Sequence, residues 1–194
     1  MTAIEIYEKE NPECHESEEE YVEWLEQMVS LRYEPTILKW IKQMFIHAEE
    51  KEWFETYWAI DIHGTVSRPD YRKTIKEIEY YPYAKETMKL ISDRPDIILI
   101  MSTSSYPDEI DTYVEQFAGD GIKFRYINKN PEISSDRGSF GYYEDKFYFN
   151  VFFDDKSGFN PDRDWKFLYD YFSSTKFRPN KEWNMKYKEK YHID

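Results

Sequence analysis

The chain has 194 residues, which suits one ordinary domain with a short extension and leaves little room for two. Acidic residues outnumber basic ones, and the formal net charge of -13 disfavours non-specific binding to nucleic acid or anionic lipid. A lone cysteine excludes an intrachain disulfide framework, and no apolar run reaches the length of a membrane span. Without a signal-peptide pattern at the start, we expect a cytoplasmic protein of unknown oligomeric state.

Two helices are predicted before the first strand. Ser17 and Glu20 have the spacing of a capping box, and apolar residues recur at helical spacing after them as far as residue 32. Pro35 suits the start of a second helix, which should end near Glu50. We expect residues 1–52 to be a helical extension that serves as a scaffold, with a lid or a dimer surface as the alternative.

Alternating strands and helices are predicted for the rest of the chain. Short apolar runs that end in polar residues or glycine are typical of buried strands, and helical patterns separate them. This order indicates a three-layer Rossmann-like α/β domain over residues 53–175, with a parallel sheet flanked by helices. The runs cover residues 57–60, 97–101 and 149–153, and the helices residues 83–92, 108–117 and 162–172.

Three segments leave the topology less defined. Residues 123–127 form a further short strand, and a hairpin between residues 138–143 and 146–153 is an alternative for the last one. Residues 176–194 are rich in lysine, and we interpret them as a solvated basic tail rather than a basic patch.

Polar residues follow each of the three apolar runs. The first run ends in Asp61, the second in residues 102–105 with the sequence Ser-Thr-Ser-Ser, and the third in Asp154 and Asp155. Such residues also cap helices and start turns, so each alone is ambiguous. Ligands bind at the carboxyl ends of strands in open parallel sheets, and the three endings together therefore favour a site there.

The order and content of these endings resemble the haloacid dehalogenase superfamily of phosphohydrolases. Residues 61–65, Asp-Ile-His-Gly-Thr, are similar to its first motif, Asp-x-Asp-Gly-Thr, and the pair Asp154 and Asp155 to its fourth. Its second motif, a Ser or Thr after a strand, is matched by Thr103 or Ser102. Its third, a Lys ahead of the last strand, has two matches, the better being Lys146 and the other Lys129.

The resemblance implies phosphoryl transfer through an aspartyl-phosphate on Asp61, an established role for a carboxylate. It also implies a Mg²⁺ ion held by Asp61, the main-chain oxygen of His63 and Asp154, with Asp155 bound through water or to a loop amide. Mg²⁺ prefers oxygen ligands and often takes only one or two carboxylates together with substrate phosphate. The metal would offset the repulsion between an anionic nucleophile and an anionic substrate.

The remaining motif residues are expected to hold the phosphoryl group. The resemblance implies that Lys146 holds the phosphoryl oxygens and the Asp61 carboxylate in line, and that Thr103 donates a hydrogen bond to the same group. Ser104 and Gly64 complete the expected substrate-binding set. The stretch after the first motif is too short for a large helical cap, so we expect a minimal cap, an open site and a small phosphorylated substrate.

His63 departs from the pattern, since phosphatases of the superfamily have an aspartate there that acts as general acid and base. A histidine can do this work near neutral pH, because its ordinary pKa is about 6.5. A structural hydrogen bond is the alternative role. The sequence therefore predicts a Mg²⁺-dependent phosphohydrolase, with a catalytically degenerate metal- or phosphate-binding module or an interaction protein as alternatives.

Overall fold

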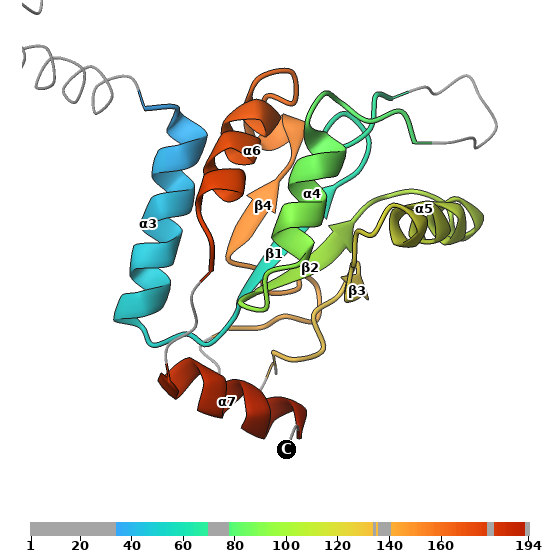
Figure 1. Cartoon of the computed structure of the whole chain (residues 1–194). Coiled ribbons are helices and arrows are strands. Elements are labelled where there is room, and N and C mark those ends of the chain that lie inside the picture. The colour runs from blue at the N-terminus through green and yellow to red at the C-terminus, as the bar shows by residue number, and fades with distance from the viewer. Residues whose placement is uncertain (1–33, 70–77, 134, 136–140, 178–180, 193–194) are drawn as a thin grey trace, which may run out of the picture. The chain divides into compact units, whose positions relative to one another are not determined.

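The structure, a computed structural model, describes residues 34–69, 78–133, 135, 141–177 and 181–192 (Figure 1). The chain divides into two compact units, Met1–Pro35 and Thr36–Asp194. The helix predicted up to residue 32 lies outside the described residues. The second unit contains helices α3 (Thr36–Glu50), α4 (Ala84–Ser92), α5 (Pro107–Gly119), α6 (Asp164–Ser174) and α7 (Lys181–Tyr191), strands β1 (Thr56–Asp61), β2 (Ile97–Ser102), β3 (Tyr126–Ile127) and β4 (Val151–Phe153), and the short 3-10 helix η1 (Asp155–Ser157).

The predicted α/β fold is confirmed. The strands form one parallel sheet in the order β3-β2-β1-β4, and β1 is paired in parallel with both β2 and β4. The residues of β1 and β2 are buried except the last of each, as expected for strands covered on both faces. The strand predicted at 123–127 is reduced to β3, and residues 146–150, an arm of the alternative hairpin, form no strand.

Helices α3, α4 and α6 cover one face of the sheet (Figure 1). The side chain of Trp58 in β1 is fully buried there, and its ring centroid lies 5.9 Å from that of Phe45 in α3 and 5.9 Å from that of Phe172 in α6. Burying a large apolar side chain contributes roughly 1.5–3 kcal/mol, so α3 is bound firmly to the sheet. This helix, predicted as part of an extension ending at residue 52, instead belongs to the compact unit of the sheet.

The other face of the sheet is covered largely by irregular chain. Tyr57, Ile98 and Ile100 form a second buried cluster, against which Phe147 and Tyr148 pack from the segment before β4. Helix α5 lies on the β2 and β3 side of the domain (Figure 1). Among the helices that the structure describes, none is long and apolar enough to cross a bilayer.

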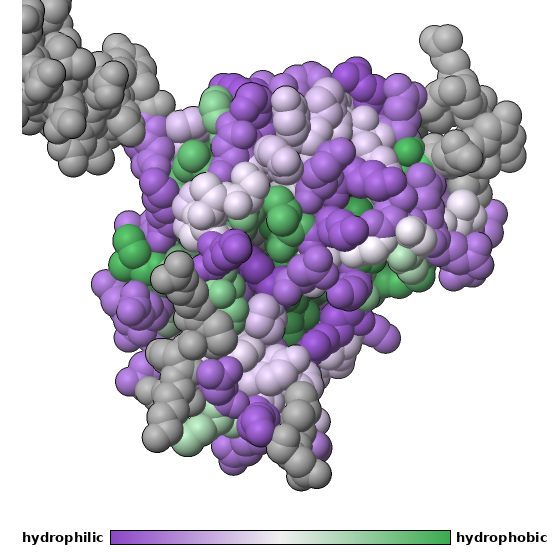
Figure 2. Space-filling model, in the orientation of Figure 1, coloured by the Kyte–Doolittle hydropathy of each residue, from purple (hydrophilic) through white to green (hydrophobic). Residues whose placement is uncertain are grey.

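The C-terminal segment expected as a solvated tail contains α7. Trp183 donates a hydrogen bond from Nε1 to the Phe54 carbonyl oxygen at 3.1 Å and stacks on its ring, with centroids 4.9 Å apart. Lys190 forms ion pairs with Glu55 and with Glu132. The lysine-rich composition therefore hid an aromatic face that attaches α7 beside the start of β1. The face of the molecule in Figure 2 is mostly hydrophilic, with small apolar areas between the polar side chains.

Candidate active site

Strand register brings two of the predicted carboxylates together. Ile60 of β1 pairs with Phe153 of β4, so Asp61 and Asp154, the next residues, stand side by side at the carboxyl edge of the sheet. Burial, followed by the negative charge of Asp154, raises the pKa of Asp61 from its ordinary 3.8 to about 6. A raised carboxyl pKa next to a second carboxylate is typical of a functional site, because this crowding disfavours the ionised pair.

Thr65 ties the two acidic loops to each other. Its hydroxyl donates to Asp61 Oδ2 at 3.2 Å and accepts a hydrogen bond from the main-chain nitrogen of Asp155 at 3.0 Å. Trp165 of α6 donates from Nε1 to the Thr65 carbonyl oxygen at 2.7 Å, and both Thr65 and Trp165 are fully buried. The separation between the first and fourth motifs is thus set by a buried hydrogen-bonded contact.

Gly64 is required by the turn between Asp61 and Thr65. Its φ of +87° lies in the left-handed region that favours glycine. A Cβ atom at this position would come within 2.7 Å of Asp155 Oδ2. The absence of a side chain therefore lets the Asp155 carboxylate approach the loop of the first motif.

A lysine that the sequence analysis did not select lies beside the acidic pair. The main-chain nitrogen of Lys156 donates to Asp154 Oδ1 at 2.7 Å, and the Lys156 side-chain Nζ forms an ion pair with Asp155 Oδ1 at 2.8 Å. Its positive charge lowers the pKa of Asp61, opposing the larger effects of burial and Asp154. Lys156 is exposed, so it provides a cation at the rim of the site.

The donors at this edge suit Mg²⁺ bound with few protein ligands. In the described part of the chain, no cluster of three or more His, Cys, Asp and Glu side chains is arranged to hold a metal. Asp61 and Asp154 are nevertheless two neighbouring carboxylates, and Mg²⁺ commonly binds one or two carboxylates plus waters and substrate phosphate. Burial and the charge of Asp154 raise the pKa of Asp61, and a divalent cation bound between the two carboxylates would offset their repulsion.

Thr103 is held at the end of β2 by Asn128. Its main-chain nitrogen donates to Asn128 Oδ1 at 2.8 Å, and Asn128 Nδ2 donates to its carbonyl oxygen at 2.7 Å. Its hydroxyl lies 2.8 Å from the Ser105 hydroxyl. Ser102 ends β2 opposite Asp61 in the sheet register, and Ser104 is exposed. Of the serines after β2, Ser105 is therefore the one joined to Thr103 by its side chain.

His63 is held by two hydroxyl groups. Its Nε2 lies 3.0 Å from Tyr113 Oη in α5 and 3.2 Å from Ser105 Oγ. Burial lowers the pKa of His63, although the charge of Glu109 opposes this effect. A neutral imidazole offers one donor and one acceptor nitrogen, and here the hydrogen-bond partners of Nε2 are the hydroxyl groups of Tyr113 and Ser105.

The two predicted lysines of the third motif lie in different places. Lys146 has its Nζ 5.5 Å from the ring centroid of Phe149, and no hydrogen bond or ion pair joins it to Asp61, although both are described residues. The chain after it is attached by Asn150 to Tyr57, near the start of β1, whereas Asp61 is at the end. Lys129 directly follows Asn128, the residue that holds Thr103.

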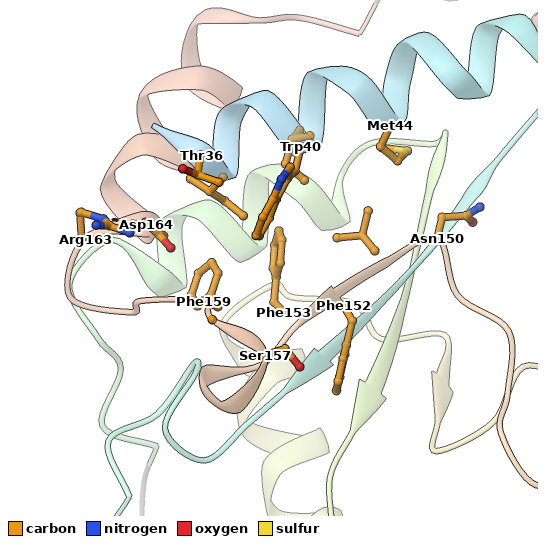
Figure 3. A pocket seen from close by; sticks show the side chains of 14 residues that line it. Thr36, Trp40, Met44, Asn150, Phe152, Phe153, Ser157, Phe159, Arg163 and Asp164 are labelled. Atoms are coloured by element: carbon orange, nitrogen blue, oxygen red, sulfur yellow. Dashed lines mark hydrogen bonds and ion pairs between the residues drawn. The ribbon is translucent and has the colours of Figure 1, made fainter. Parts of the chain in front are cut away.

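A pocket of mixed polar and apolar lining lies elsewhere, at the β4 edge of the sheet. It has a volume of about 210 Å³ and is formed by α3, β4 and residues 157–164. Figure 3 shows Trp40 reaching from α3 toward Phe153 of β4. The carboxylates of Asp61 and Asp154 do not line it. The site built on Asp61 and Asp154 therefore lies outside this pocket.

Sequence reasoning missed several residues of the site for different reasons. Ser105 and Lys156 directly follow predicted motif residues in the sequence, and this position could have marked them as candidate site residues. Thr65 was part of the first motif, but its link to Asp155 needed the fold. Tyr113 gave no signal, because in the sequence it belongs to the apolar stripe of a helix.

Comparisons with known proteins add little to this geometry. No family model matches the chain, and no curated protein matches it. A similar solved structure is that of a conserved protein from Bacteroides thetaiotaomicron, which is 26% identical, covers 63% of this chain and 93% of its own, and has a TM-score of 0.47. This similarity assigns neither a family nor an activity to the chain.

Proposed function

We propose that this protein is a Mg²⁺-dependent phosphohydrolase of haloacid dehalogenase type that acts on a small phosphate ester. One observation carries the proposal: the register of β1 and β4 puts Asp61 and Asp154 side by side at the carboxyl edge of a parallel sheet. The order of the residues along the chain, residues 61–65 first and Asp154 with Asp155 last, supports the same family.

Asp61 is the nucleophile in this proposal. One of its carboxylate oxygens bonds to phosphorus while the ester P–O bond breaks, and the leaving alkoxide takes a proton from solvent as it departs as the alcohol. Water then attacks the phosphorus of the aspartyl-phosphate and returns a proton to solvent, the bond from phosphorus to Asp61 breaks, and inorganic phosphate and the free carboxylate result. With a pKa of about 6, Asp61 is mostly ionised at neutral pH and so is available for the attack.

The neighbouring groups bind and orient. Asp61 and Asp154 would hold Mg²⁺, which supplies charge neutralisation for the phosphoryl group. Thr65 donates to Asp61 Oδ2 and so leaves the other oxygen of this carboxylate for the attack. The Thr103 hydroxyl and the Lys156 ammonium group, which is paired with Asp155, lie at the same edge and suit contacts with phosphoryl oxygens.

A second candidate function is favoured by His63. In a phosphatase, the group at this position exchanges protons with the leaving oxygen and with water. Nε2 of His63 contacts Tyr113 and Ser105 instead. This contact favours a module that binds Mg²⁺ and a phosphate group without efficient turnover.

Phosphate release separates the two candidates. Wild-type protein and Asp61→Asn are assayed against generic and nucleotide phosphate esters with Mg²⁺ and with EDTA. Asp145→Asn, at an exposed position next to Lys146, which no hydrogen bond or ion pair joins to Asp61, is the matched control for loss of one negative charge. We expect Mg²⁺-dependent release by the wild type and by Asp145→Asn, and none by Asp61→Asn.

One outcome contradicts the assignment of the nucleophile, and another contradicts the phosphohydrolase. Release that persists in Asp61→Asn would show that Asp61 is not the nucleophile. An inactive wild type that still binds inorganic phosphate in the presence of Mg²⁺, measured by calorimetry, would establish the binding module instead.

A further inference from the structure

A continuous set of side chains links the ends of β1 and β2 through His63. Its Nε2 is in hydrogen-bonding range of Tyr113 Oη and Ser105 Oγ, and Ser105 Oγ is 2.8 Å from Thr103 Oγ1. The main-chain nitrogen of Ser105 also donates to Thr103 Oγ1 at 3.2 Å. The four side chains come from the loop after β1, the loop after β2 and helix α5.

Tyr113 is the fixed end of this set. The residue is 6% exposed, and its ring packs edge-on against the imidazole, with centroids 5.5 Å apart. A buried phenol hydroxyl needs a partner, and Nε2 of His63 is at 3.0 Å. The tyrosine therefore restricts the direction of the imidazole ring.

Thr103 is the other fixed end. Asn128 holds its main-chain nitrogen and carbonyl oxygen, so the freedom that remains is the direction of the hydroxyl hydrogen. The nitrogen of Ser105 already donates to Thr103 Oγ1, which leaves the Thr103 proton for a ligand or for Ser105. A partner that determines the proton position on Ser105 consequently influences the Thr103 hydroxyl as well.

We propose that His63 is a positioning residue: held by Tyr113, it orients the Ser105 hydroxyl, and through it the Thr103 hydroxyl, toward a bound phosphoryl group. The role in phosphoryl binding rests on the proposed function, whereas the hydrogen-bonded arrangement stands on the contacts alone. His63 then strengthens phosphate binding, in contrast to the acid–base role that its position in the first motif implies.

Long-range ¹H–¹⁵N correlation spectra of the imidazole nitrogens test the arrangement. His63→Gln identifies the His63 signals among those of the other histidines, His15, His47 and His192. We expect Tyr113→Phe to shift the Nε2 resonance and the tautomer balance of His63, and Tyr142→Phe, at a 67% exposed position, to leave both unchanged. Unchanged His63 resonances in Tyr113→Phe would overturn the proposal, whether or not the protein hydrolyses esters.

Binding of inorganic phosphate with Mg²⁺ tests the role, using His63→Gln, Ser105→Ala and the double variant. If His63 acts through Ser105, each single change weakens phosphate binding by about tenfold and the double change costs little more, because coupled residues are non-additive. Additive losses, or a lower kcat with an unchanged phosphate Kd in His63→Gln, would overturn it. Thermal melting of each variant excludes general unfolding.

A wild type that binds no phosphate with Mg²⁺ overturns the phosphoryl-positioning role together with the proposed function. The spectra separate this result from failure of the contacts themselves, because a Tyr113-dependent tautomer of His63 would persist. If the wild type binds phosphate but releases none, phosphate binding by the single and double variants still tests the role of His63. Non-additive losses of affinity then support the positioning role, and additive losses overturn it.

Discussion

Replacing the predicted nucleophile should make the fold more stable. The ionised Asp61 carboxylate is disfavoured in the folded chain by burial and by the charge of Asp154, which together raise its pKa from 3.8 to about 6. Asparagine removes the charge but keeps an oxygen that can accept the Thr65 hydrogen bond. Asp61→Asn should therefore unfold at a higher temperature than the wild type in metal-free buffer at pH 7.5.

The size of the gain follows from the pKa of Asp61. A rise in pKa from 3.8 to about 6 raises the proton affinity of Asp61 by roughly two orders of magnitude, each worth about 1.4 kcal/mol. The gain in the free energy of unfolding is therefore at most about 3 kcal/mol. Asp61 is partly exposed, and solvent screening reduces the expected gain to about 1 to 2 kcal/mol. For a chain of this length, this corresponds to a melting temperature higher by about 2 to 8 °C.

The effect of Asp61 on the free energy of unfolding should depend on pH, in a direction set by its raised pKa. The raised pKa means that the folded chain binds this proton more tightly than the unfolded chain, so the wild type loses stability as pH rises from about 4 through 6. The advantage of Asp61→Asn should vanish near pH 4, where the wild-type carboxyl is protonated in the folded state. Above pH 6 the advantage should reach its full size.

Urea unfolding followed by tryptophan fluorescence at pH 4, 6 and 7.5 with EDTA measures this difference. Asp145→Asn is the control, and as an exposed substitution it should change stability by less than about 0.5 kcal/mol. At a Mg²⁺ concentration about tenfold above its Kd, the wild type should gain about 1.4 kcal/mol and Asp61→Asn less. An Asp61→Asn variant no more stable than the wild type at pH 7.5 would refute the charge crowding at Asp61.

Three further predictions concern the loops, the charges and the helices. Gly64→Ala should lower phosphate release, because its Cβ would push the Asp155 carboxylate from its place and the positive φ of 87° strains alanine; wild-type activity would contradict the close approach. Burial favours the neutral form of Asp120, but its hydrogen bond from Lys85 outweighs this and lowers the pKa. Asp120→Asn should thus cost about 1 kcal/mol at pH 7 in urea unfolding, and the loss should disappear in acid as the wild-type carboxyl protonates; an equal loss at low pH would be inconsistent. Trp183→Ala should lower stability by about 1 to 3 kcal/mol in thermal unfolding, whereas a solvated tail would give no change.

The local sequence was sufficient to predict the central strands and most helices. The apolar run at residues 97–101 stops at polar residues, and β2 ends at Ser102 as this pattern indicates. Pro35 marks the start of α3 and Glu50 is its last residue. Such boundaries follow from nearest-neighbour chemistry, since side-chain burial and turn preferences act over a few residues.

The prediction of a solvated C-terminal tail was wrong because it rested on charge composition alone. Charge dominates the composition of α7, yet Trp183, Tyr187 and Tyr191 recur every four residues and their rings follow one another along the helix. Counting charges concealed this narrow apolar face. Whether such a face finds a partner depends on the surface it meets, here Phe54 ahead of β1.

The sequence by itself determined which residues stand at the strand ends: Asp61 after one buried run and Asp154 after another. Only the tertiary structure decided which groups meet. Strand order placed β4 next to β1 and so brought the two carboxylates together, while α5 delivered Tyr113 to His63 from fifty positions along the chain. Strand order and helix packing arise from the burial of distant apolar surfaces against one another, and local patterns carry no record of which distant partner is chosen.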